Sequence, residues 1–287
     1  MDFKAEWAQA LEEIAKPYTN ASGNVDFARL AESEEFKSAM QVLIKDWARN
    51  FNTIRAKKIE GFVALYDILG FQSLVENNNL DTVMLTYQQM MECHNIVEYV
   101  EIIKVINYSD TFLIYTTEVS DRAFKLLLLM SNLLFVAANA HEMPIRGATA
   151  VGELYVSDAV AIGRPIVEAY KSEKKQNWMG CWITHECVDR ISKETIEELL
   201  GERTIVRYPI PLKEGDVREL YALNWLSLLM KGTDSMLRAI REPLKNTGFL
   251  KQKPGHGWAE ERKHGHTRQF IDFIYSLLPD VSKPPIQ

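Results

Sequence analysis

The chain has 287 residues, of which 47% are hydrophobic and 25% are charged, a balance that is typical of a folded globular protein. Its formal net charge of −6 argues against a general attraction to nucleic acid or to an anionic membrane, and we expect neither as a partner. The three cysteines lack the CxxC spacing of a redox or zinc motif, which indicates reduced thiols in a cytoplasmic protein.

Residues 1–57 predict a helical N-terminal region. Hydrophobic residues recur at helical spacing in 5–15 and again in 36–51. The sequence TNASGNVD between them contains the residue types that form turns, and Asp26 at its end is a candidate cap for the next helix.

Residues 58–225 alternate strand and helix patterns and predict a mixed domain. The strand patterns cover 61–69, 101–107, 111–117, 144–151, 153–156, 181–184, 205–208 and 219–225. The helix patterns cover 82–99, 121–140, 162–175 and 195–200. The first six elements run strand–helix–strand–strand–helix–strand, which is the βαββαβ order of the ferredoxin-like fold. We therefore predict the α+β class, with two helices on one face of a mostly antiparallel sheet.

The helix pattern at 121–140 contains the most apolar run of the chain, LLLLMSNLLFVAANA at 126–140. This run includes Ser131 and Asn132 and is shorter than the ~20 apolar residues that cross a bilayer. It predicts a buried helix.

Residues 226–287 predict a helical C-terminal region. Helix patterns at 227–244 and 267–278 flank the segment 246–266, which is rich in glycine and charge and predicts a surface loop. Three histidines lie in this segment: His256, His264 and His266.

Two aspartates lie at the ends of neighbouring strands. Asp67 follows an apolar run, where an ionised carboxylate is costly unless it is paired or binds a metal. Asp110 lies at the tip of the hairpin formed by the next two strands. Because the first strand and this hairpin lie side by side in a βαββ unit, we expect both carboxylates to project towards one point, where a divalent cation would relieve their repulsion. Gly70 allows a sharp turn whose amides can point at phosphate oxygens, so the pattern predicts two-metal phosphoryl chemistry.

Four segments resemble the class III adenylate and guanylate cyclases, over about residues 58–190. FVALYDILGF resembles their first-strand signature, SDTFLIY their second metal-binding hairpin, IRGATAVGELYV their Arg-x-Gly strand, and AIGRPIVEAYKSE the opening of their late helix. The resemblance implies a nucleotide cyclase domain at 58–225 that uses two divalent cations, Mn²⁺ or Mg²⁺. It implies that Asp67 and Asp110 bind both cations and that the Ile68 carbonyl contacts one of them. The substrate-binding residues that it implies are Ile68, Leu69, Gly70 and Phe71, with the turn holding the phosphates.

The late helix departs from the family pattern. Family members often place an asparagine and an arginine there, and the matching positions are Val167 and Lys171. Lys171 is the expected catalytic cation, although a lysine lacks the bidentate fork of an arginine. Its rivals on the same stretch are Lys174, Lys175 and Gln176.

Two further positions bear on the substrate. The lysine that reads a purine is replaced, with Ile106 at the nearest match and Lys104 displaced on the same strand, whereas Arg146 fits the family strand but is more simply a structural residue. These losses are expected in the pyrimidine cyclases of the Pycsar anti-phage systems, which share the DILGF-type strand. That resemblance implies conversion of UTP, or alternatively CTP, into the cyclic monophosphate. It also implies a homodimer with composite sites and a separate effector that senses the product.

Three other hypotheses remain open. A purine cyclase with unusual base contacts differs only in its substrate. A regulatory module that binds nucleotide without turning it over would explain the missing asparagine and arginine, but retention of both aspartates argues against it. A polymerase-palm-like protein also carries paired aspartates, but the acidic charge and the lack of an evident template-binding region count against it.

Overall fold

The computed structural model describes residues 9, 12–20, 23, 25–51, 56–78, 80–91, 101–157, 160–215, 217–230 and 258–277. The chain divides into two units, Met1–Ala56 and Lys57–Gln287.

The first unit is helical over most of its described residues. A short 3₁₀ helix, η1 (Lys16–Tyr18), precedes helices α2 (Phe27–Glu32) and α3 (Glu34–Phe51). Helix α2 begins where the Asp26 carboxylate accepts a hydrogen bond from the Arg29 amide at 3.1 Å. The prediction that Asp26 caps this helix is therefore confirmed.

The predicted helix at 36–51 lies within α3. Of the predicted helix at 5–15, residues 12–15 are helical, and most of the rest lies outside the described residues.

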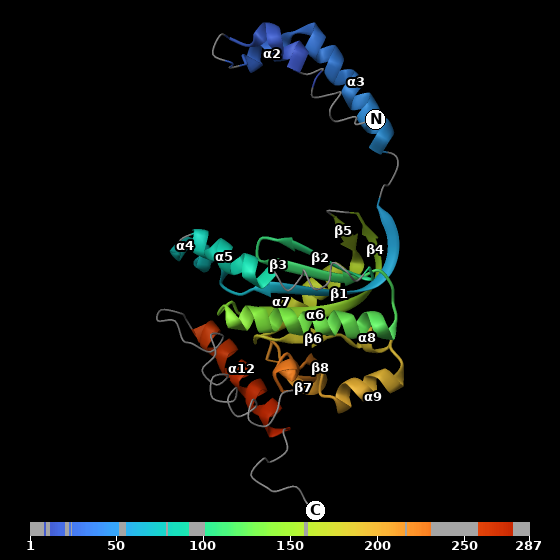
Figure 1. Ribbon diagram of the computed structural model, residues 1–287, viewed down its shortest axis with the longest axis vertical. Coiled ribbons are helices and arrows are strands. Elements are labelled where there is room, and N and C mark those ends of the chain that lie inside the picture. The colour runs from blue at the N-terminus through green and yellow to red at the C-terminus, as the bar shows by residue number, and fades with distance from the viewer. Residues whose placement is uncertain are drawn as a thin grey trace, which may run out of the picture. The chain divides into compact units, whose positions relative to one another are not determined.

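The second unit begins with seven elements that form its core. They are β1 (Lys57–Ile68), α4 (Phe71–Asn77), α5 (Leu80–Met91), β2 (Ile103–Tyr108), β3 (Thr111–Thr116), α6 (Asp121–Ala140) and β4 (Ile145–Val156). The strands lie in the order β2-β3-β1-β4, and each is antiparallel to its neighbour (Figure 1). This is the βαββαβ connection with ferredoxin-like strand order, so the predicted α+β class and core topology are confirmed.

The remaining elements extend this core. They are β5 (Ala161–Gly163), α7 (Arg164–Lys175), β6 (Cys181–Ile183), α8 (His185–Val188), α9 (Lys193–Gly201), β7 (Ile205–Pro211), β8 (Val217–Leu223), α10 (Ser227–Met230) and α12 (Trp258–Ser276). Strand β6 joins β4 in parallel, and β8 and β7 continue the sheet in antiparallel pairing. Strand β5 pairs with β4 off this path.

Strand β1 is the centre of the core because it pairs with β3 on one side and β4 on the other. Its side chains alternate between two hydrophobic clusters, as the pleat of a strand requires. Phe62 packs against Phe124 of α6, with ring centroids 5.1 Å apart. Val63 and Leu65 belong to a second cluster that includes Ala169 of α7. Helices α6 and α7 therefore cover opposite faces of the sheet.

Helix α5 lies on the same face as α6. The ring of Tyr87 packs against Phe112 at 5.5 Å, and Phe112 belongs to the cluster that contains Phe62 and Phe124. The two crossing helices of the core thus share one face, as predicted, and α7 has the other.

Two predicted boundaries near the sheet were wrong. The sequence predicted separate strands at 144–151 and 153–156, but β4 is continuous because Gly152 pairs with Gly61 and keeps the ladder intact. The predicted helix at 162–175 begins at Arg164, since Ala161–Gly163 pairs with β4 as a strand.

The C-terminal prediction was wrong in one segment. Residues 258–266, predicted as a loop from their glycine and charge content, are the first half of helix α12. Tertiary packing outweighs this local composition: Phe270 packs against Trp178 at 4.8 Å and against Tyr208 at 4.9 Å. His264 and His266 therefore lie on a helix.

Several predicted stretches lie partly outside the described residues. The helix predicted at 82–99 is described as α5 up to Met91, and the one at 227–244 as α10 up to Met230. His256 is also outside them.

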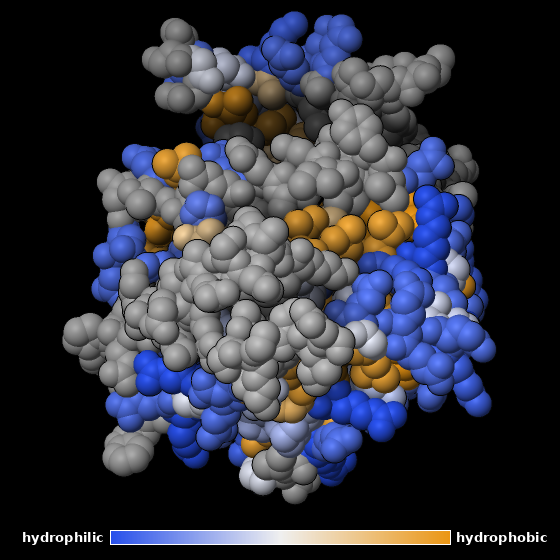
Figure 2. Space-filling model, turned by 60° about the horizontal axis from the view of Figure 1, so that its bottom comes forward, coloured by the Kyte–Doolittle hydropathy of each residue, from blue (hydrophilic) through white to orange (hydrophobic). Residues whose placement is uncertain are grey.

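Within the described residues, α6 is the one helix that is long and apolar enough to span a membrane by length and composition. Its side chains Phe124, Leu127 and Phe135 are fully buried in the core, as expected for the central helix of a domain. On the face of the molecule that Figure 2 shows, hydrophilic side chains lie beside separate hydrophobic areas.

We predict that Gly147→Ala destabilises the protein by about 2–3 kcal/mol through overpacking. A Cβ atom at Gly147 would overlap the Tyr66 ring and lie 2.6 Å from the carbonyl oxygen of Leu65. Gly201→Ala is the matched control, because no atom lies within 4 Å of its added Cβ. Urea unfolding followed by circular dichroism measures both, and equal unfolding midpoints would contradict the packing at Gly147.

Candidate active site

The ends of β1 and of the β2–β3 hairpin meet at one edge of the core. Asp67 is paired with Thr111 of β3, directly after the turn that contains Asp110. The amide of Ile68 donates a hydrogen bond to the backbone carbonyl of Asp110 at 2.9 Å. The structure thus brings together the three residues for which the sequence predicted metal binding.

Local backbone conformation supports this meeting of strand ends. Ser109, in the hairpin turn, has a φ of 55°, a left-handed conformation that tight hairpins require. Gly70 has a φ of 76°, and the space around its missing Cβ is open, so conformation rather than space favours glycine there.

The backbone amides of the turn predicted to hold phosphates differ in whether the fold already uses them. The Leu69 amide donates to the carbonyl of Pro144 at 2.8 Å, which commits that donor to the fold. Gly70 is the N-cap of α4 and Phe71 is its first residue, so their amides lie at a helix start, where donors have no acceptor within the helix. Phosphate binding by Ile68, Leu69, Gly70 and Phe71 stays a prediction, and the last two residues suit it best.

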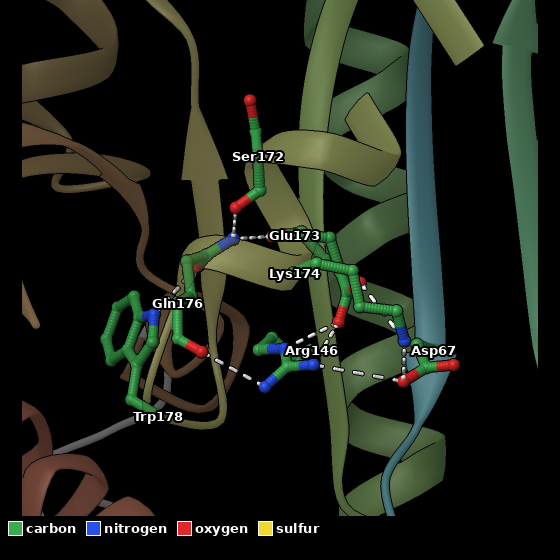
Figure 3. Close-up of polar contacts among 8 residues, drawn as sticks. Asp67, Arg146, Ser172, Glu173, Lys174, Gln176 and Trp178 are labelled. Carbon is green, nitrogen blue, oxygen red and sulfur yellow. Dashed lines mark hydrogen bonds and ion pairs between the residues drawn. The ribbon is translucent and has the colours of Figure 1, made fainter. Parts of the chain in front are cut away.

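A buried ion pair lies beside Asp67 (Figure 3). Arg146, paired with Asp67 across β1 and β4, is 3% exposed, and Glu173 of α7 is fully buried. The Arg146 Nε atom donates to Glu173 Oε1 at 2.6 Å, and a second guanidinium nitrogen pairs with the same oxygen. The guanidinium also lies 4.0 Å from Asp67 Oδ2.

Lys174 completes this group of charges. Its Nζ atom donates to Asp67 Oδ2 at 3.2 Å and lies 3.5 Å from Glu173 Oε2 (Figure 3). Partial burial acts to lower the pKa of Lys174, but Glu173 and Asp67 outweigh it and raise the pKa above its ordinary value. Burial raises the pKa of Glu173, and Arg146 partly offsets that rise. Two cationic side chains therefore converge on one carboxylate oxygen of Asp67.

Gln176 and Trp178 hold Arg146 from the other side. Arg146 donates to the Gln176 backbone carbonyl at 3.1 Å, and the Gln176 side chain donates to the Gly147 carbonyl at 2.8 Å. The indole of Trp178 donates to Gln176 Oε1 at 2.8 Å. Gln176, which the sequence analysis gave as a rival of Lys171 for the late-helix role, is thus a buried residue that holds Arg146 and β4 in place.

Lys171 lies elsewhere on α7. It is exposed, and within the described part of the chain it forms no ion pair with Asp67. Val167 is also exposed, at 51%. The buried side chains of the helix are Pro165, Ala169 and Glu173, spaced by four residues. The catalytic role of Lys171 stays a prediction that needs a second chain.

Sequence reasoning missed Glu173 and underrated Arg146 and Lys174. A signal was present, since Glu173 continues the inward stripe of Pro165 and Ala169 at helical spacing. A carboxylate on a buried stripe needs a buried cation as partner, and Arg146 was the arginine in the neighbouring strand pattern.

The residues present suit divalent cations. Asp67 and Asp110 offer hard carboxylate oxygens, and the Lys174 ammonium marks a place beside Asp67 where the structure favours positive charge. Among the described residues, no group of three or more His, Cys, Asp or Glu side chains could hold a metal ion. A cation here would complete its coordination with waters and substrate phosphates, as Mg²⁺ commonly does.

Comparison with known proteins identifies similar solved structures. No protein-family model matches the chain, and no curated protein matches it. The similar solved structures include adenylyl and guanylyl cyclases.

Three of these structures illustrate the degree of similarity. The catalytic core of a rhodopsin-guanylyl cyclase with converted specificity, in complex with ATPαS, is 14% identical and gives a TM-score of 0.45, covering 60% of this chain and 98% of its own. The guanylate cyclase domain of RhGC from Catenaria anguillulae, in complex with GTP, is 15% identical with a TM-score of 0.42 and coverages of 59% and 98%. The adenylyl cyclase CyaB from P. aeruginosa is 16% identical with a TM-score of 0.41 and coverages of 59% and 95%. The sequence identities and TM-scores are low. The fold assignment therefore rests on the strand order, and the site assignment rests on the chain's own contacts.

We predict that Glu173→Gln lowers the free energy of unfolding by about 3 kcal/mol, because it leaves the buried Arg146 charge without its main partner. Glu168→Gln, on the exposed side of the same helix, should change it by less than about 0.5 kcal/mol. Urea denaturation measures both variants, and a neutral effect of Glu173→Gln would show that the pair carries no net charge interaction.

Proposed function

We propose that the chain is a nucleotide cyclase that converts UTP into 3′,5′-cyclic UMP and pyrophosphate. The observation that carries this proposal is the meeting of Asp67 and Asp110 at adjacent strand ends of a βαββαβ sheet. The turn through Gly70 into α4 adds backbone donors beside these carboxylates.

The reaction needs little beyond positioning and charge. The 3′-oxygen of the ribose forms a bond to the α-phosphorus, the bond from that phosphorus to the bridging oxygen breaks, pyrophosphate leaves, and the hydroxyl proton passes to solvent. Asp67, Asp110 and the Ile68 carbonyl would hold two divalent cations, Mn²⁺ or Mg²⁺. When bound, these cations would activate the hydroxyl and neutralise the charge of the leaving group. Arg146, held by Glu173, lies 4.0 Å from Asp67 Oδ2 and adds positive charge beside that carboxylate.

A pyrimidine base is the proposed specificity. Ile106, at the position nearest the purine-reading lysine of the cyclase family, packs beside the cluster of Val63, Leu65 and Leu113. An apolar side chain there cannot donate a hydrogen bond to a purine. UTP is the favoured substrate and CTP the alternative. On the Pycsar resemblance, the product is a cytoplasmic anti-phage messenger that a separate effector senses.

The proposed enzyme is a homodimer with composite sites. Helix α7 and the β4–β5 hairpin expose apolar side chains that suit contact with a second copy, namely Tyr155, Val160, Ile162, Val167 and Tyr170. Lys171 lies on the same helix and would reach the aspartates of the partner.

A second candidate is a nucleotide-binding module without turnover. The exposed Val167 favours it, because the cyclase family often has an asparagine at this position. A valine cannot make the ribose contact that the asparagine makes in that family.

We predict that the purified protein, given Mn²⁺ and each of the four ribonucleoside triphosphates, forms cyclic UMP from UTP. Asp67→Ala and Asp110→Ala should each lower the rate at least about 100-fold, since lost metal stabilisation is worth several kcal/mol. Asp272→Ala, an exposed aspartate on α12, is the control. Mass spectrometry identifies the product. Cyclic CMP alone would establish the alternative substrate. Nucleotide binding without consumption would favour the nucleotide-binding module or an enzyme that needs an activating signal.

We predict that mixing inactive Asp67→Ala and Lys171→Ala chains restores activity. Random exchange makes half of the dimers mixed, each with one intact composite site, so about a quarter of the wild-type rate should return. The rate is measured after co-refolding or co-expression. Failure to recover any activity, with dimers verified by light scattering, would contradict the composite arrangement.

A further inference from the structure

The two cations beside Asp67 differ in how firmly they are held. Arg146 is 3% exposed and is fixed by Glu173 and by the Gln176 carbonyl. Lys174 is 40% exposed, and its ammonium pairs with Asp67 Oδ2 and Glu173 Oε2 at 3.2 and 3.5 Å. Arg146 is therefore a permanent part of the core, whereas Lys174 can leave its position by rotating a flexible side chain.

The charges explain why Lys174 is needed at this place. Arg146 is committed to Glu173 by its shortest contacts and is 4.0 Å from Asp67. Asp67 is largely buried, at 17% exposed, and would otherwise hold an incompletely balanced negative charge. The Lys174 ammonium, 3.2 Å from Asp67 Oδ2, supplies that balance.

We propose that Lys174 is the resident countercation of Asp67 and that a divalent cation binds by displacing its ammonium. This inference rests on the metal-binding part of the proposed function. A divalent ion and the ammonium compete for the same carboxylate oxygen and repel each other, so both cannot occupy it. In its resident position the Lys174 ammonium also lies over the Tyr170 ring, 5.5 Å from its centroid. The Lys174 side chain is 40% exposed, so the displaced ammonium can turn into solvent.

Removal of the ammonium should therefore strengthen metal binding by the nucleotide-free protein. We expect Lys174→Met to bind Mn²⁺ about fivefold more tightly than the wild type, as follows from losing a competing ion pair worth about 1 kcal/mol. Lys175→Met is the matched control, because Lys175 is the next residue, is exposed, and forms no ion pair among the described residues. Electron paramagnetic resonance of free Mn²⁺ measures the affinity without any turnover.

A second measurement follows the lysine itself. With ¹³C-labelled lysine, the Cε–Hε signal of Lys174 is assigned by its absence in Lys174→Met. We expect Mg²⁺ to move this signal to the position that it has in metal-free Asp67→Asn, where the carboxylate partner is lost. The Lys175 signal should not move.

The outcomes separate this inference from the proposed function. An unchanged or weaker Mn²⁺ affinity in Lys174→Met, or a Lys174 signal that saturating Mg²⁺ leaves in place, overturns the displacement. No Mn²⁺ binding by any variant overturns both this inference and the metal site. Metal binding with lysine displacement, but without a cyclic product from any triphosphate, supports this inference and overturns the cyclase.

Discussion

A carboxylate that is shut away from water must be paired, and the Glu173–Arg146 pair is the contact on which the candidate site depends. It joins α7 to β4 at the point where β4 lies beside Asp67. Without the glutamate, the arginine would be a buried cation with only a distant partner; without the arginine, the glutamate would face Asp67 as a like charge. The pair thus anchors α7 to β4 and keeps a positive charge beside the Asp67 carboxylate.

The two strands that flank β1 bring different residues to the two sides of Asp67. Through β3 it places Asp110 next to Ile68, and through β4 it places Arg146 beside Asp67. In the proposed function, the substrate reacts on the side of Asp110, and Arg146 balances the charge of Asp67 on the other side. Because alternate residues of β1 face α6 and α7, the strand carries this polar end while its middle is buried on both faces.

Much of this arrangement could be predicted from the sequence because it follows local patterns. The order of strands and helices fixed the core topology, and the positions of Asp67 and Asp110 at strand ends placed them at one edge. Contacts between distant side chains have no comparable local signal. The pairing of Lys174 with Asp67 depends on the rotation of α7 about its axis against the sheet. The helical structure of residues 258–266 depends on the packing of Phe270 against Trp178 and Tyr208. Only the inward stripe of α7 pointed to Glu173.

The site is also assembled from parts that are far apart along the chain. Lys174 is 107 residues from Asp67, and Arg146 belongs to the last strand of the βαββαβ core. Contacts of such long sequence separation form late, because a large loop must close before they are made. During synthesis, the strands that bring Asp67 and Asp110 together emerge well before Arg146, Glu173 and Lys174. An incomplete chain would hold Asp67 without these cations, so the charge balance at Asp67 is a property that only the finished domain acquires.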